Sequence, residues 1–165
     1  MRPATQPAEF RASMPSPLGM LGLRSNLNGL CEIAVLPEGS PARKPADPLL
    51  LETLLRLEAY FAGATADFSD LPLAPEGTPF QHRVWAALRA IPPGSTRRYG
   101  QLAADLDTAA RAIGGACRAN PLLLVVPCHR VVASTGDGGF MGASDGDWPR
   151  RKQQLLAHER SHFRA

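Results

Sequence analysis

The stretch Leu122–Val132, which reads LLLVVPCHRVV, constrains this chain more than any other. By its length and its branched apolar composition, the run Leu122–Val126 predicts a buried strand. Pro127 is expected to end that strand, because proline has no N–H to give to a strand ladder. Cys128 is therefore expected at the exit of a rigid buried element, which is the kind of position that holds a nucleophile in place.

A cysteine next to a histidine is compatible with several chemistries. Only the thiolate attacks well, and a free thiol has a pKa of about 8.5, so Cys128 needs a base or a favourable field. Neighbours in a strand point to opposite faces, so either the chain turns after Pro127 or a water bridges Cys128 and His129. The residues alone leave open a cysteine hydrolase, a buried structural cysteine, and a thiol that accepts a transferred group and keeps it.

A third group should orient the imidazole of His129. The candidate lies in a last helix, WPRRKQQLLAHER, which we expect Asp147 to cap. Leu155 and Leu156 are expected to pack inward there, and Glu159 follows them by one turn.

The net charge of +3 hides an asymmetry between the two halves of the chain. Residues 1–77 hold six Arg and Lys against nine Asp and Glu, whereas residues 78–165 hold twelve against six. A basic half beside an acidic half predicts a nucleic-acid-binding domain with a separate support domain. Uneven solvation charge is the alternative.

Length and cysteine usage limit the class of protein. The 165 residues suffice for one good domain, or for a large and a small one. Three cysteines without a CxxC pair argue against a disulfide framework and a four-ligand zinc site, and they suit a reducing cytoplasm. No apolar run is long enough to span a bilayer, and the N-terminus lacks the apolar segment of a signal peptide. We therefore predict no metal, no cofactor and no membrane contact.

The N-terminal half predicts a small α/β unit. Apolar stretches at 17–23 and 30–36 flank the turn signal Asn28-Gly29, which indicates a β-hairpin. Asp47 is expected to cap a helix that Pro48 opens. Residues 64–77 have the character of a linker, and we expect residues 1–12 to be disordered.

The C-terminal half predicts mainly helices. Thr78 and Gln81 form a capping box at the start of the first one. Two short helices follow at about Tyr99–Leu106 and Ala109–Ala119, and Asp107-Thr108 is expected to cap the second. Two short helices with a brief turn are typical of a helix-turn-helix.

The second short helix has an unusual face. Arg111, Gly115 and Arg118 lie at i, i+4 and i+7, and Gly114 lies beside them. Each glycine costs a helix roughly 1 kcal/mol relative to alanine. Close approach to a flat partner such as nucleic acid would offset that cost, and we favour this over the alternative of tight helix–helix packing.

These residues together resemble the O6-alkylguanine-DNA alkyltransferases, also called methylated-DNA–protein-cysteine methyltransferases. The likeness is carried by PCHRV (127–131), by NP ahead of it and by ARAIGGA, and it also covers residues 77–103, GGFMG (138–142) and LLAHE (155–159). SPLGMLGL and LEAYFAG match more loosely the ribonuclease-H-like domain of that family. The resemblance implies an α+β fold: a small ribonuclease-H-like α/β domain at 1–76, and at 77–165 a mostly helical domain with a helix-turn-helix and a short active-site strand.

The resemblance also implies the activity. The chain would move an alkyl group from O6-alkylguanine, or from O4-alkylthymine, in a flipped-out nucleotide irreversibly onto Cys128. His129 would act as a base through a water, Glu159 would orient His129, and Asn120 would tie the recognition helix to the active-site turn. A lesion-binding module without transfer activity is the alternative, and a cysteine hydrolase is a distant third.

The implied partner is double-stranded DNA, bound through its minor groove by a monomer, at the nucleoid if the source is bacterial. Arg111 would fill the gap left by the flipped nucleotide, and Tyr99 would crowd the 3′ phosphate. The implied DNA-binding set is Tyr99, Arg111, Ala112, Gly114, Gly115 and Arg118. The implied base pocket is Tyr99, Pro127, Val131, Phe140 and Met141.

Three features depart from the family pattern. The join between the short helices is about two residues shorter than usual and lacks the common Gly/Asn-Pro turn. Phe140 stands where a tyrosine is usual. The loop 142–150 carries about five extra residues beside the pocket, so the preferred alkyl group does not follow from the resemblance.

Overall fold

The computed structural model describes residues 10–135 and 146–163, which fall into two units. The N-terminal unit ends at Glu76 and also includes Pro121–Leu123, whereas the C-terminal unit holds the chain from Gly77 to Asn120 and again from Leu124. One unit is built on a sheet and the other on helices, so the predicted α+β class is confirmed. Because Pro121–Leu123 returns to the first unit, the division is not contiguous in sequence.

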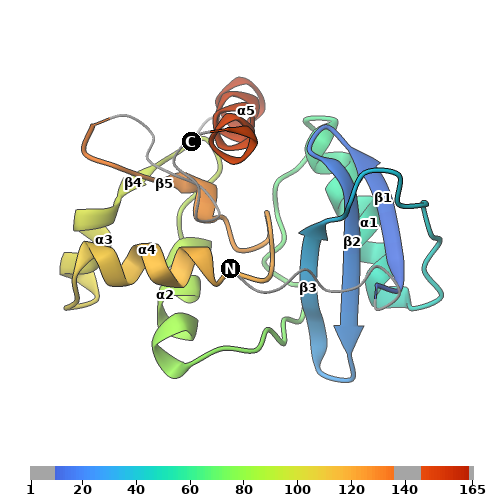
Figure 1. Cartoon of the computed structure of the whole chain (residues 1–165), viewed down its shortest axis with the longest axis horizontal. Coiled ribbons are helices and arrows are strands. Elements are labelled where there is room, and N and C mark those ends of the chain that lie inside the picture. Colours follow the sequence, from blue (N-terminus) through green and yellow to red (C-terminus); the bar gives the residue numbers. More distant parts are fainter. Residues whose placement is uncertain (1–9, 136–145, 164–165) are drawn as a thin grey trace. The chain divides into compact units, whose positions relative to one another are not determined.

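The N-terminal unit is a three-stranded antiparallel sheet covered by one helix (Figure 1). Its strands are β1 (Ala12–Ser16), β2 (Gly19–Asn26) and β3 (Gly29–Val35), in the order β1-β2-β3. The predicted hairpin is confirmed, because β2 and β3 pair with Asn26 opposite Gly29. Helix α1 (Pro48–Phe61) packs against the three strands.

The start of α1 follows the sequence signal. The Asp47 side chain accepts a hydrogen bond from the Leu49 N–H at 2.8 Å, and Pro48 occupies the first turn, as predicted. The helix then buries Leu50, Leu54 and Leu57 on its inner face. These side chains form one wall of the core of this unit.

The expected disorder of residues 1–12 is wrong for its last part. Phe10 is only 2% exposed, and Ala12 is the first residue of β1, where it pairs with Leu23. The strand ASMPS is short and holds a proline and two serines, so it gives little sequence signal, and for that reason β1 was not predicted.

Pro121–Leu123 extends the sheet of the N-terminal unit. The Ile33 N–H donates to the Pro121 carbonyl at 2.9 Å, and the Leu123 N–H donates to the Ile33 carbonyl at 3.3 Å. Leu122 forms a single parallel bridge with Ile33. The segment that leads to Cys128 is thus held by β3 along three residues.

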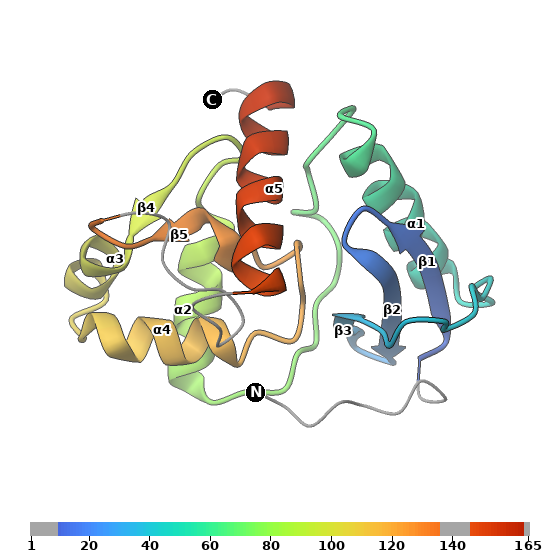
Figure 2. The same ribbon diagram turned by 45° about the horizontal axis from the view of Figure 1, so that its top comes forward.

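The C-terminal unit is mostly helical (Figure 2). Its elements are α2 (Pro79–Arg89), β4 (Arg97–Arg98), α3 (Tyr99–Asp105), α4 (Ala110–Arg118), the 3-10 turn η2 (Cys128–Arg130), β5 (Val131–Val132) and α5 (Asp147–His162). The capping box at the start of α2 is present as predicted: Gln81 N–H donates to Thr78 Oγ1 at 3.1 Å, and Thr78 N–H donates to Gln81 Oε1 at 2.9 Å.

The predicted helix-turn-helix is formed by α3 and α4, which pack against each other and lie beside α2. The indole Nε1 of Trp85 in α2 donates to the Ala116 carbonyl at 2.9 Å. That carbonyl belongs to the last turn of α4, where helix carbonyls have no partner within the helix. Trp85 is therefore a core residue that also fixes the end of α4.

The join between α3 and α4 differs from the prediction. Asp107 does not cap α4, whose N-cap is Ala109, without a side-chain hydrogen bond. Instead Asp107 adopts the left-handed conformation (φ 52°), and Thr108 N–H donates to the Ala103 carbonyl at 2.9 Å. Asp107 N–H donates to the Ala104 carbonyl at 3.3 Å, so α3 ends in a Schellman motif with aspartate where glycine is usual. This motif makes the short join possible.

The start of α5 also differs. Its N-cap is Gly146 (φ 88°), and Asp147, which we expected to be the cap, is the first helical residue. None of the helices among the described residues combines the length and the apolar character needed to cross a bilayer.

Candidate active site

Cys128 is presented by a tight turn and not by a strand. The predicted strand Leu122–Val126 is wrong: after the bridge at Leu122 the backbone turns, and Leu124 takes a left-handed conformation (φ 73°). Leu124 is 2% exposed, so the run is apolar because it is buried, although its backbone is irregular. The turn η2 then begins at Cys128, with the thiol 3% exposed.

Asn120 ties the end of α4 to this turn. Its Nδ2 donates to the Val126 carbonyl at 2.8 Å and to Cys128 Sγ at 3.3 Å. Asn120 is itself only 4% exposed. One amide therefore holds both the backbone ahead of the cysteine and the sulfur, and it links them to the helix that carries Arg111 and Arg118.

His129 is paired with the carboxylate of α5. Its Nε2 lies 2.6 Å from Glu159 Oε2, and both side chains are fully buried. The other ring nitrogen, Nδ1, is buried and has no hydrogen-bond partner among the described residues. Likewise no hydrogen bond joins His129 directly to Cys128 within that part of the chain, in agreement with the expectation from their adjacency.

Arg130 completes the pair from the same turn. Its Nε donates to Glu159 Oε1 at 2.7 Å and its Nη2 to Oε2 at 3.1 Å. Burial alone would raise the pKa of Glu159. The hydrogen bonds from His129 and Arg130, together with the charge of Arg130, have the larger effect and hold the pKa of Glu159 well below its usual range. Glu159 is therefore a carboxylate, and since a carboxylate only accepts, His129 carries its proton on Nε2.

The protonation states of Cys128 and His129 follow from their burial. Burial raises the pKa of Cys128, although the Asn120 hydrogen bond and the charge of Lys152 act in the opposite direction. Burial lowers the pKa of His129 despite the hydrogen bond that its Nε2–H donates to the Glu159 carboxylate. At neutral pH the site thus holds a thiol beside a neutral imidazole with an open lone pair.

Helix α5 supplies two charges from one face. Lys152 and Glu159 are one heptad apart and both are fully buried, with Leu155 and Leu156 between them. The Lys152 Nζ donates to the Val131 carbonyl at 2.6 Å and lies 5.7 Å from the centre of the Tyr99 ring. Its ammonium charge favours the thiolate form of Cys128.

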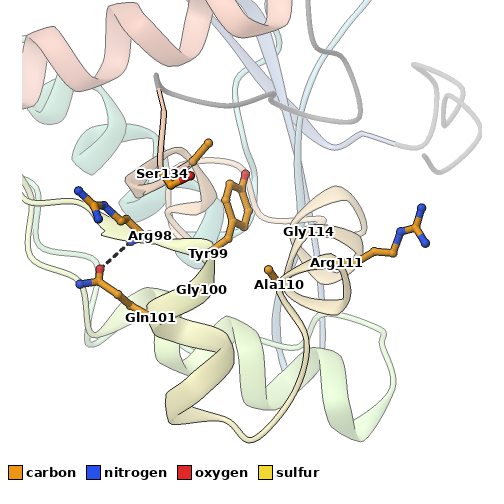
Figure 3. Close-up of a pocket in the computed structure, with 9 residues that line it drawn as sticks. Arg98, Tyr99, Gly100, Gln101, Ala110, Arg111, Gly114 and Ser134 are labelled. Atoms are coloured by element: carbon orange, nitrogen blue, oxygen red, sulfur yellow. Dashed lines mark hydrogen bonds between the residues drawn. The ribbon is translucent and has the colours of Figure 1, made fainter.

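A two-stranded sheet, with two residues in each strand, places Tyr99 next to the active site. β4 and β5 are parallel, with Arg97 opposite Val131 and Arg98 opposite Val132, so the start of α3 lies next to the exit of η2. Tyr99 also lines a pocket of about 710 Å³ that is shown in Figure 3, together with Arg98, Gly100, Gln101, Ala110, Arg111, Gly114, Ala133 and Ser134. In that view the Arg98 and Arg111 side chains point away from each other on either side of Tyr99.

The outer face of α4 is bare. Arg111, Gly115 and Arg118 are exposed and Gly114 and Ala112 are half-exposed, whereas Ile113, Ala116 and Cys117 are buried. A Cβ built on Gly114 or Gly115 would meet no atom within 4 Å. Tight helix–helix packing, the alternative explanation for these glycines, is therefore absent among the described residues. No ion pair is formed by Arg111 or Arg118 with any described carboxylate.

The remaining predicted residues fall into two groups. Pro127 and Val131 are buried on either side of η2. Phe140 and Met141, and residues 142–145 of the loop 142–150, lie outside the described residues. Within the described part of the chain no group of three or more His, Cys, Asp and Glu side chains could hold a metal ion.

Three charged residues of the site were missed from sequence. Arg130 and Lys152 are buried, and Arg98 lines the pocket beside Tyr99. The heptad spacing of Lys152 and Glu159 around two leucines was a signal for a shared inward face. For Arg98 the signal was its position directly before Tyr99.

Known proteins similar to this chain agree with both units. Residues 79–161 match the family described as "6-O-methylguanine DNA methyltransferase, DNA binding domain", and residues 10–75 match its "ribonuclease-like domain". The methylated-DNA--protein-cysteine methyltransferase of Salmonella typhimurium is 50% identical over 107 residues, which are 63% of this chain and 60% of that protein. The protein of the same name from Methanosarcina barkeri is 41% identical over 138 residues, 79% of this chain and 85% of that protein.

Solved structures show the same likeness. The crystal structure of Mycobacterium tuberculosis O6-methylguanine methyltransferase matches with a TM-score of 0.77 and 37% identity, over 93% of each chain. A crystal structure of the M. tuberculosis protein in complex with DNA matches with a TM-score of 0.75 and 36% identity, over 93% of this chain and 94% of that one.

Proposed function

The chain belongs to the 6-O-methylguanine DNA methyltransferase family, and from this premise we propose that it repairs DNA by moving the alkyl group of an O6-alkylguanine irreversibly onto Cys128. The observation that carries the proposal is the buried thiol of Cys128 next to a neutral His129 whose Nδ1 has no protein partner among the described residues. This chain matches the Salmonella protein over 60% of that protein's length, so the activity in that protein's name enters here as a proposal.

The reaction needs a base, because burial keeps the Cys128 thiol protonated at neutral pH. The proton passes through a bridging water to Nδ1 of His129, and the Glu159 carboxylate stabilises the imidazolium that forms. The Cys128 sulfur attacks the alkyl carbon in line, the carbon–oxygen bond breaks, and its electron pair leaves with the guanine, which takes up a proton. The new thioether is stable, so each protein molecule acts once.

Three further groups assist the transfer. The buried ammonium of Lys152 favours the developing thiolate. Burial raises the pKa of Tyr99, so its hydroxyl keeps its proton and can donate a hydrogen bond to the leaving base or to a phosphate. Asn120 positions the sulfur through its 3.3 Å hydrogen bond.

DNA binds along the bare face of α4 and the neighbouring pocket. The open space over Gly114 and Gly115 lets a sugar–phosphate backbone approach closely. Arg111 and Arg118, which form no ion pair with a described carboxylate, supply positive charge. Arg111 occupies the gap left by the extruded nucleotide, and Tyr99 promotes the extrusion. Extrusion costs a few kcal/mol, and less for a poorly paired lesion, which favours damaged bases.

The finer features follow the family pattern. The groove contacted is the minor groove, Ala112 lies close to the backbone, and Pro127 and Val131 line the base pocket. The protein acts as a monomer in the cytoplasm, on the nucleoid in a bacterium. Three free buried cysteines support a reducing compartment.

The stoichiometry of repair tests the proposal. Duplex DNA with one O6-methylguanine is mixed with the protein in several ratios, and the restored guanine is counted after the reaction ends. Alkyl transfer predicts one repaired base per protein molecule. Turnover beyond one base would indicate a hydrolase, and binding with no repaired base would indicate a lesion-binding module.

A further inference from the structure

Arg130 lies buried behind the pair of His129 and Glu159. It is 5% exposed, and its guanidinium donates to both carboxylate oxygens of Glu159, at 2.7 and 3.1 Å. Its Nη1 donates to the Ile91 carbonyl at 2.8 Å. Three hydrogen bonds therefore fix this cation between α5 and the segment that follows α2.

One oxygen of Glu159 serves two donors. Oε2 lies 2.6 Å from His129 Nε2 and also accepts from Arg130 Nη2. An arginine keeps its proton under all conditions that a folded protein meets, whereas a buried glutamate without a cation tends to become protonated. Arg130 therefore favours the ionised form of Glu159 and leaves the shared proton on Nε2 of His129.

The alternative arrangement is chemically simple. If Glu159 were protonated, it would donate its own proton to Nε2 of His129. The neutral ring would then carry its hydrogen on Nδ1, and Nδ1 could no longer accept a proton. Uptake of one proton by the pair of Glu159 and His129 would therefore remove the base.

We propose that Arg130 is a positioning residue that keeps Glu159 ionised and so holds His129 in the form with hydrogen on Nε2 and a lone pair on Nδ1. The catalytic consequence rests on the proposed alkyl transfer, whereas the tautomer does not. Among the described residues, the other charged or titratable groups that act on His129 are Glu159 and Lys152 from α5, and Cys128 precedes it in the turn.

The tautomer can be measured without a substrate. In protein labelled with nitrogen-15 at histidine, the chemical shifts of the two ring nitrogens distinguish the protonated from the bare one. The wild type should show hydrogen on Nε2 of His129 at neutral pH, and Arg130→Met should show a substantial or dominant Nδ1–H form. A folded Arg130→Met protein with the wild-type tautomer would overturn the proposal.

Arg24→Met is the matched control. Arg24 binds the buried Glu32 with Nε and Nη2 at 3.3 and 3.1 Å, but it lies in the N-terminal unit. It should lower stability through loss of a similar pair and leave the His129 shifts unchanged. Arg130→Lys keeps the charge without the fork, so it should recover most of the Nε2–H form.

Kinetics supply the second measurement. With the free base O6-methylguanine as substrate, Arg130→Met should react about 100-fold more slowly or worse at neutral pH, which is the usual contribution of a general base. The loss should shrink as the pH rises, because Glu159 ionises and hydroxide removes the thiol proton. A uniform loss at all pH values with the wild-type tautomer would indicate a structural role and overturn the proposal.

Wild-type protein decides the matter if no Arg130 variant folds. Carbon-13 shifts of the Glu159 carboxyl should show a carboxylate from pH 8 down to the limit of folding. A Glu159 that is protonated near neutral pH, or a wild-type His129 with hydrogen on Nδ1, would refute the proposal. If the wild type does not transfer alkyl groups at all, the proposed function fails while these shifts still test the role of Arg130.

Discussion

Replacing Gly114 with alanine should make the protein more stable and a poorer ligand for DNA. The added Cβ meets no atom within 4 Å, so no clash offsets the gain in helix propensity. Alanine is favoured over glycine inside a helix by about 0.8–1 kcal/mol. For a domain of this size, such a gain raises the melting temperature by about 2–4 °C. Gly115→Ala should behave alike.

The opposite sign is expected for duplex binding. If a sugar–phosphate backbone lies against this face, the new methyl group displaces it and weakens the neighbouring arginine contacts. A loss of about 1.4 kcal/mol would weaken binding tenfold. Calorimetry gives the stability, and fluorescence anisotropy with a duplex that carries the lesion gives the affinity.

The reaction with free O6-methylguanine is the internal control, because a Cβ added at Gly114 meets no atom within 4 Å and so does not touch Tyr99 or Cys128. Its rate should stay at the wild-type value in both glycine variants. Ser161→Ala, on the exposed end of α5, serves as a helix substitution away from this face. If both glycine variants gain stability and still bind the duplex within twofold of the wild type, the outer face of α4 does not contact DNA and the reasoning is refuted.

Three further predictions follow from other parts of the C-terminal unit. Arg98→Ala should lower the slope of log Kd against log salt for duplex DNA by about 0.9, which is the value of one phosphate contact. Arg97→Ala should leave the slope unchanged, because Arg97 is paired with Asp105 at 2.7 Å. Equal slopes for both variants would show that Arg98 does not contact a phosphate. Asp107→Gly should raise the free energy of unfolding, measured by urea denaturation, by about 0.5 kcal/mol. The reason is that φ at this position is 52°, which glycine adopts without strain. A loss of stability would contradict the Schellman assignment. The rate at which iodoacetamide alkylates Cys128 should still increase at pH values above the usual pKa range of a thiol, since burial raises the pKa of Cys128. A rate that levels off below pH 8 would show that the thiolate already dominates at neutral pH.

The sequence predicted the elements whose signals are local. The capping box of Thr78 and Gln81 and the Asp47-Pro48 start depend on residues within one turn of each other, and both are present. The Asn28-Gly29 signal likewise located the β2–β3 hairpin. These signals do not depend on tertiary contacts, which explains why they were sufficient.

The failures depend on tertiary structure. Leu122–Val126 is apolar because it is buried, and a buried turn has the same composition as a buried strand. Leu124 and Asp107 both take left-handed conformations without the glycine that would have announced them. The sequence shows the charges of Arg130 and Lys152 but not their burial, which follows from their partners Glu159 and the Val131 carbonyl.

The candidate site was better predicted than the backbone that holds it. Cys128, Asn120, His129 and Glu159 were chosen from sequence, and the structure joins them as two buried hydrogen-bonded pairs at one turn, Asn120 with Cys128 and His129 with Glu159. Their catalytic roles stay predictions. The resemblance supplied these residues because it concerns the chemistry, whereas the turn that presents them depends on packing around Leu124.

The central claim is that Cys128 itself accepts the alkyl group. The most direct measurement is the mass of the intact protein, and then of its Cys128 peptide, after incubation with duplex DNA that carries O6-methylguanine. The account predicts a gain of one CH₂ unit on the Cys128 peptide and no gain in Cys128→Ala protein under the same conditions. Repair of the DNA with no change in protein mass, or a methyl group on another residue, would contradict it.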